Sequence, residues 1–148
     1  MVETESNKRI YLLFFSLTLI IIVPILIAYE FEDDSTRYEH KDLDIFRDRA
    51  ETILEGDLLY RDTEHVTLTP PLINYLFVPA VLLGNTALVW TCLFAVFGFL
   101  SSVILYHILL KLFDKRYAVA GTIFFITSPF SNYTTILMMQ DDAIIVSF

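Results

Sequence analysis

The side chains that could do chemistry are concentrated in one acidic segment, residues 30–69, between two long apolar blocks. This segment contains 13 Asp or Glu residues against 5 Lys or Arg residues, whereas acidic and basic residues balance one another in the rest of the chain. Carboxylates can accept protons as general bases, and an arginine fork is well shaped to bind phosphate oxygens. We therefore expect any chemistry of this chain to begin in this segment.

Four basic side chains of the segment are candidates for binding a phosphate group: Lys41, Arg47, Arg49 and Arg61. The alternative is a solvated polar face balanced by Asp48, Glu51 and Asp62, and for each basic residue taken singly this alternative is favoured. His40 and His65 lie among acids, but their spacing matches no metal-ligand motif. A metal site is therefore not predicted here.

Two blocks carry no Asp, Glu, Lys or Arg: residues 10–29 and residues 65–110. With 55% hydrophobic residues and a mean hydropathy of +0.59, the composition is far from that of a soluble domain of this length. A helix needs about 20 apolar residues to cross a bilayer, which offers no partner for open backbone groups. The sequence predicts an all-α, polytopic membrane protein with about four transmembrane helices. A nucleic-acid-binding protein is excluded, because the chain has no basic patch and a formal net charge of -8.

The charge pattern divides the chain into segments. We predict a tail at 1–9, a first transmembrane helix at 10–29, a loop at 30–85, a second transmembrane helix at 86–110, a hairpin at 111–116 and, at 117–148, a short or broken third helix and the start of a fourth. Lys8 and Arg9 lie on the same side as the basic hairpin under this span count. Basic residues favour the cytoplasmic side, so the tail and hairpin are predicted to be cytoplasmic and the loop external. His107 is expected near the cytoplasmic end of the second span, with its hydrogen bonds satisfied.

The first part of the external loop is predicted to contain an amphipathic helix over residues 42–55. Its apolar residues recur at three- and four-residue spacing, which places them on one face of a helix lying along the membrane surface. Asp42 and Asp44 stand where a first-turn acid belongs, and Gly56 stands where a helix ends.

The second part of the loop is predicted to contain a short interfacial helix. Pro70-Pro71 suits a helix start, and Gly84-Asn85 closes the apolar run over residues 72–83. This helix is too short to cross a bilayer, so we expect it to pack at the interface.

The order of several residues in the loop is similar to a pattern found in a known family. They are Asp42, Phe46, Ala50, Gly56, Leu59-Tyr60, Asp62 and Pro70-Pro71-Leu72. This order resembles the first external loop of the GT-C superfamily of membrane glycosyltransferases, which includes protein O-mannosyltransferases, lipid A aminoarabinose transferases and polyprenyl-phosphate-mannose-dependent mannosyltransferases. The resemblance covers about residues 10–148, and the elements are more specific together than singly.

The resemblance implies an inverting transfer of a sugar from a polyprenyl-phosphate donor to an acceptor on the external face. The acceptor hydroxyl must lose a proton as it attacks, and a carboxylate suits that task. Asp42 matches the family's base by its spacing to Phe46 and Ala50, and Asp44 is the second candidate. In some branches of the superfamily the base is followed by Glu, but here Leu43 follows Asp42. This difference makes the chain more similar to the mannosyl-phosphate-dependent branches. The alternative is that both acids only stabilise the start of a helix through its dipole.

The resemblance also implies substrate-binding roles for four residues: Tyr60, Arg61, Asp141 and Asp142. The first two lie in the matched segment and face a lipid-linked phosphate, while the two acids begin a fourth span and bind the acceptor or a cation. Carboxylates at the edge of a hydrocarbon segment are costly and tend to be functional, although a wet, helix-capping pair at the interface is the alternative. Whether a divalent cation binds is left open, and no other cofactor is implied.

The expected partners are membrane lipid, a polyprenyl-phosphate-linked sugar and an acceptor glycan, lipid or protein. The chain resembles the N-terminal quarter to third of such an enzyme, which implies a fragment, a split gene product with a C-terminal companion chain, or a reduced relative. We expect the chain alone to be inactive. A different class stays open: a non-catalytic membrane accessory subunit that uses its helices for packing and its acidic loop to contact a partner.

Overall fold

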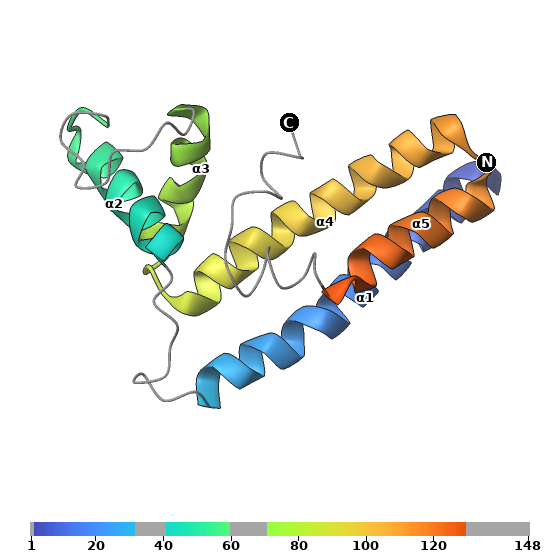
Figure 1. Ribbon diagram of the computed structural model, residues 1–148, viewed down its shortest axis with the longest axis horizontal. Coiled ribbons are helices and arrows are strands. Elements are labelled where there is room, and N and C mark those ends of the chain that lie inside the picture. Colours follow the sequence, from blue (N-terminus) through green and yellow to red (C-terminus); the bar gives the residue numbers. More distant parts are fainter. Residues whose placement is uncertain (1, 32–40, 60–70, 130–148) are drawn as a thin grey trace.

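The computed structural model describes residues 2–31, 41–59 and 71–129. These residues form five α-helices and no strand, in agreement with the predicted all-α class. The helices are α1 (Val2–Phe31), α2 (Lys41–Glu55), α3 (Pro71–Leu82), α4 (Ala87–Leu112) and α5 (Lys115–Thr127) (Figure 1).

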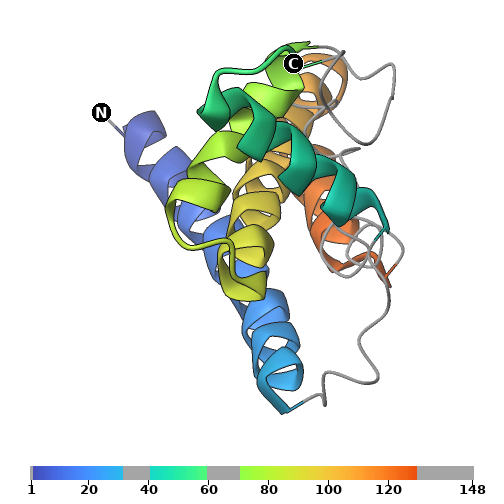
Figure 2. The ribbon, with the colours of Figure 1, turned by 90° about the vertical axis from the view of Figure 1, so that its left-hand side faces the viewer.

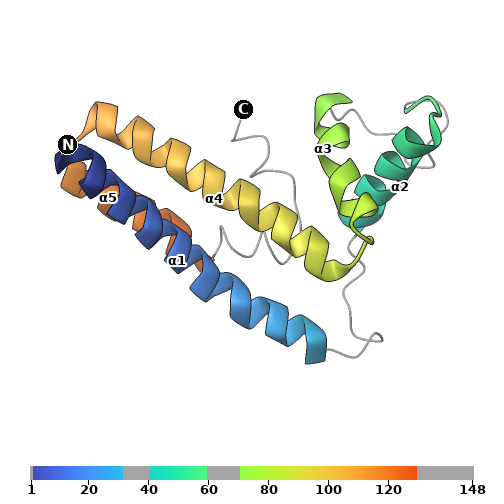
Figure 3. The ribbon, with the colours of Figure 1, turned by 180° about the vertical axis from the view of Figure 1, so that it is seen from behind.

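Helices α1, α4 and α5 lie side by side, with α4 running opposite to the other two (Figures 1 and 3). Phe14, Tyr106, Ala118 and Ile126 form the buried core between them. Two of these helices are long and apolar enough to cross a membrane: α1, over Asn7–Ile25, and α4, over Leu88–Leu112. These two segments correspond to the first and second predicted spans.

The remaining helix of this bundle, α5, is short. It has 13 residues, which at 1.5 Å per residue gives a length of about 20 Å, less than the ~30 Å of a hydrocarbon core. It ends at Thr127, with Ser128 as its C-cap, so the predicted interruption at Ser128-Pro129 is confirmed. The predicted start of a fourth span near Met138 lies outside the described residues.

The start of α1 differs from the prediction. The helix begins at Val2 and not at Ile10, so most of the predicted tail is helical. Apolar patterning marks where a helix becomes buried in lipid, but it does not mark where the helix begins.

Helices α2 and α3 form a separate helical pair seated on the first turns of α4. Figure 2 shows α2 crossing in front of α3 and α4. The core that joins the three helices contains Leu43, Phe46, Ala50, Ile73, Phe77, Ala80, Trp90 and Phe94. Both helices agree with the predicted ranges to within a residue, because the apolar face and the helix-ending signals are local in the sequence.

Both helices of the pair end in the same way, with a glycine in the left-handed conformation. Gly56 has φ 81°, and its N–H and that of Asp57 donate to the carbonyls of Ile53 and Thr52 at 3.2 and 3.1 Å. Gly84, with φ 110°, ends α3 through the equivalent bonds, so that both ends are Schellman motifs. The predicted helix stops at Gly56 and Gly84-Asn85 are confirmed.

Candidate functional site

The two predicted catalytic residues lie in the first turn of α2. Asp42 is the second residue of this helix, and Asp44 is the fourth. The Asp44 side chain is 61% exposed, and its Oδ1 lies 3.7 Å from Nη1 of Arg47. An exposed ion pair at this distance contributes little to stability, so the Asp44 carboxylate is accessible for chemistry or for binding.

Aromatic packing fixes the first turns of α2 against both neighbouring helices. The Phe46 ring stacks on Phe77 of α3 with 4.4 Å between ring centroids, and lies 6.2 Å from the ring of Phe94 of α4. Leu43 and Ala50 are buried on the same side. The backbone that carries Asp42 and Asp44 is therefore anchored by its own helix to the beginning of α4.

A second anchor is a chain of hydrogen bonds that joins α2 to the turn between α3 and α4. The indole Nε1 of Trp90 donates to Oδ1 of Asn85 at 2.8 Å, and Nδ2 of Asn85 donates to Oε1 of Glu51 at 3.3 Å. Asn85 has φ 54°, a left-handed conformation that asparagine tolerates better than most residues. Glu51, expected only to balance arginines on a polar face, thus has a specific structural partner.

Arg49 does not lie on the solvated face that the sequence predicted. Its side chain is 1% exposed, and Nη1 donates to Oδ1 of the fully buried Asn74 at 3.1 Å. This bond joins α2 to α3 inside their shared core, so Arg49 is not presented to a phosphate at the surface. The sequence contained a signal, because Arg49 lies between Phe46 and Ala50 on the apolar face of α2, and Asn74 interrupts an apolar helix.

The other predicted site residues are placed as follows. Arg47 stays partly exposed beside Asp44. Tyr60, Arg61, Asp141 and Asp142 lie outside the described residues, as do His40 and His65. Within the described ranges, no three His, Cys, Asp or Glu residues are grouped so as to hold a metal ion.

The basic residues of α1 and of the turn between α4 and α5 gather at the opposite end of the bundle. Nζ of Lys115 donates to Oδ1 of Asn7 at 3.3 Å, which brings the first turns of α1 next to the start of α5. Figures 1 and 3 show the amino terminus beside the turn between α4 and α5. One turn deeper, Oη of Tyr11 and Nε2 of His107 are hydrogen bonded at 3.0 Å, which confirms that His107 is satisfied. The two basic clusters therefore share one end of the bundle, as predicted.

Comparisons with protein-family models, with curated proteins and with solved structures found no match.

Proposed function

We propose that this chain is a multi-pass membrane protein that serves in sugar transfer of the GT-C type. A sugar passes from a polyprenyl-phosphate donor to an acceptor on the external face, and Asp42 is the general base. One observation carries the proposal: α2, which has Asp42 and Asp44 in its first turn, is packed on the end of the apolar bundle opposite its basic end.

The charges of the two ends support the orientation. Lys8, Arg9, Lys111, Lys115 and Arg116 lie in the segments at one end, and the acidic α2 lies at the other. By the positive-inside rule the basic end is cytoplasmic, so α2 and α3 are external. In this arrangement α1 and α4 each cross the membrane, and α5 is the short third span of a polytopic protein with about four transmembrane helices.

The depth of α2 suits a lipid-linked donor. The apolar stretch of α4 begins at Leu88, and Phe46 of α2 packs near Phe94. Phe94 lies six residues after Leu88, so the first turns of α2 lie within about 9 Å of the membrane interface. A polyprenyl-phosphate sugar has its chain in the hydrocarbon core and its phosphate and sugar at that same level.

The transfer itself is a single displacement at the anomeric carbon. The acceptor oxygen forms a bond to this carbon while the bond to the phosphate oxygen breaks, and polyprenyl phosphate leaves with the electron pair. The proton of the acceptor hydroxyl passes to the carboxylate of Asp42. Because attack and departure occur on opposite faces of the sugar, the anomeric configuration inverts. A positioned carboxylate contributes about 10²–10⁴-fold to such a step.

The test compares two isosteric variants of neighbouring acids in the full chain within its native membranes. Transfer is followed as release of polyprenyl phosphate from radiolabelled polyprenyl-phosphate mannose. Asp42→Asn is expected to lower the rate by at least about 100-fold at unchanged expression. Asp44→Asn tests the second candidate for the base and is expected to retain most activity. Full activity of Asp42→Asn would overturn the proposal and favour the accessory-subunit alternative.

A further inference from the structure

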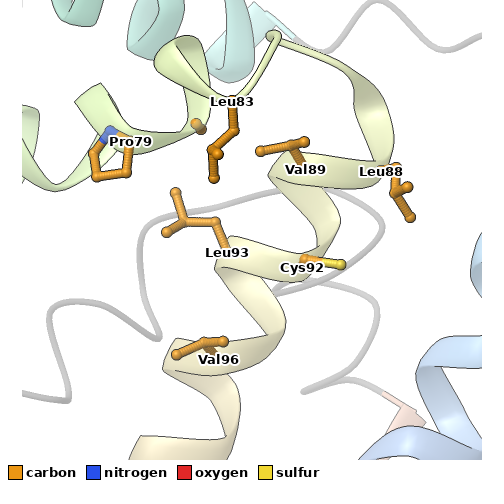
Figure 4. A pocket seen from close by; sticks show the side chains of 8 residues that line it. Pro79, Leu83, Leu88, Val89, Cys92, Leu93 and Val96 are labelled. Carbon is orange, nitrogen blue, oxygen red and sulfur yellow. The ribbon is translucent and has the colours of Figure 1, made fainter.

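An apolar hollow lies between the second half of α3 and the first turns of α4. Its volume is about 290 Å³. The residues that line it are Pro79, Ala80, Leu83, Leu88, Val89, Cys92, Leu93 and Val96. Figure 4 shows the side chains of Leu83, Val89 and Leu93 gathered around one space, with Pro79 beyond them and Val96 farther along α4.

The lining of this hollow presents only apolar surface. Its outer wall is open, since Leu83, Leu88 and Val96 are 71%, 52% and 55% exposed. A water-filled site would need polar groups to hold its waters, and the lining offers none. A lining that is entirely apolar favours a hydrocarbon chain as the ligand.

The hollow has a defined depth along the span. It follows α4 from Leu88 to Val96, the first part of the apolar stretch Leu88–Leu112. At 1.5 Å per residue this distance is about 12 Å, which is less than half of a hydrocarbon core of about 30 Å. The hollow therefore begins at one membrane interface and stays within a single leaflet.

We infer that this hollow holds one acyl chain of a phospholipid from the external leaflet. The inference rests on the membrane placement in the proposed function. The volume accommodates about ten methylene groups, if each is taken as similar in size to a water molecule of ~30 Å³. An acyl chain spans one leaflet, as the hollow does, whereas a polyprenyl chain is much longer. A vacant hollow would leave its lining without contacts on one side, and a seated chain restores them.

The seated chain also completes the contact between α3 and α4. On one side of α3, Phe77 packs against Trp90 with 5.7 Å between ring centroids. On the other side, Pro79 and Leu83 face α4 across the hollow (Figure 4). The lipid chain fills this gap and so steadies the helix on which α2 rests.

The test measures lipid retained by the full chain after purification in a mild detergent. Native mass spectrometry is expected to show one phospholipid per chain. Phosphatidylcholine with a photoreactive group in the middle of one acyl chain is expected to crosslink to residues 88–96. Retention of a polyprenyl lipid with no phospholipid, a crosslink confined to other segments, or no retained lipid would each overturn the inference.

A pair of variants on the same face of α4 provides the control. Val96→Phe fills the hollow and is expected to lower phosphatidylcholine binding by about tenfold, as overpacking does. Leu100→Phe adds a ring one turn away, at an exposed position outside the lining, and is expected to leave binding unchanged. Cys92→Phe is a second filling variant, used if Val96→Phe fails to fold. Equal binding by the filled and control variants would contradict the inference. Because no sugar transfer is measured, its failure is distinguishable from failure of the glycosyltransferase proposal.

Discussion

The indole N–H of Trp90 in α4 donates to the side-chain oxygen of Asn85 at 2.8 Å, and the side-chain N–H of Asn85 donates to Oε1 of Glu51 in α2 at 3.3 Å. These two hydrogen bonds link Trp90, a buried residue of the candidate span α4, to α2, the helix that has Asp42 in its first turn. Asn85 serves both neighbours at once, because its amide offers an acceptor to one and a donor to the other.

Replacing Asn85 should loosen the external helices. Asn85→Ala removes both hydrogen bonds and forces alanine into a left-handed conformation, so we expect a loss of about 2–3 kcal/mol in the free energy of unfolding. Trp90 is the single tryptophan, so its fluorescence reports on this site, and its emission should shift to the red as water enters. Asn85→Gly keeps the backbone conformation and should recover about 1 kcal/mol. If alanine and glycine variants were equally stable, the backbone at Asn85 would carry no strain.

Phe46 should be the main anchor of α2. Its ring stacks on Phe77 and is 5% exposed, so Phe46→Ala is expected to cost about 3–5 kcal/mol. Limited proteolysis is expected to cut within residues 41–59 of this variant and to leave the same residues of the native protein intact. Leu54→Ala is the control on the same helix, because Leu54 is exposed and should change neither stability nor cleavage. Equal sensitivity of the two variants would show that α2 is not held by this contact.

Arg49 and Asn74 should be energetically coupled. Their bond lies inside the α2–α3 core, where a change in one partner alters the surroundings of the other. Arg49→Met and Asn74→Leu are each expected to be destabilising by about 2 kcal/mol, and the double variant by less than the sum. Thermal unfolding of the four proteins completes the double-mutant cycle. Strict additivity would mean that the bond at 3.1 Å has no net contribution to stability.

Gly121 should set the distance between α5 and α4. A Cβ atom built there would lie 2.9 Å from Cδ1 of Leu109, so any side chain requires Leu109 to move. Gly121→Ala is expected to cost less than about 1 kcal/mol, since the end of a leucine side chain can shift, whereas Gly121→Leu should cost about 1–3 kcal/mol. Thermal unfolding of Gly121→Leu combined with Leu109→Ala tests the cause. The second change should restore part of the lost stability, and no rescue would place the clash elsewhere.

Much of the helical framework was predictable because its signals are local. The apolar face of α2, the glycine that ends it and the Ser128-Pro129 break after α5 each lie within a few residues of the feature they specify. The partners of Arg49 and Glu51 were not predictable in this way. Asn74 and Asn85 lie 25 and 34 residues away, so those contacts depend on how the helices pack. The place of Asp42 and Asp44 at the start of α2 was predictable from the local pattern, whereas the position of α2 depends on its packing against α3 and α4.

The account stands on α2 lying at the external surface and the basic end lying in the cytoplasm. In a Cys92→Ser background, Asp44→Cys and Lys115→Cys each introduce one exposed cysteine, at opposite ends of the bundle. Intact cells are treated with a membrane-impermeant maleimide, before and after permeabilisation. The account predicts immediate labelling at position 44, and labelling at position 115 only after permeabilisation. Labelling of both positions in intact cells, or of position 115 alone, would contradict it.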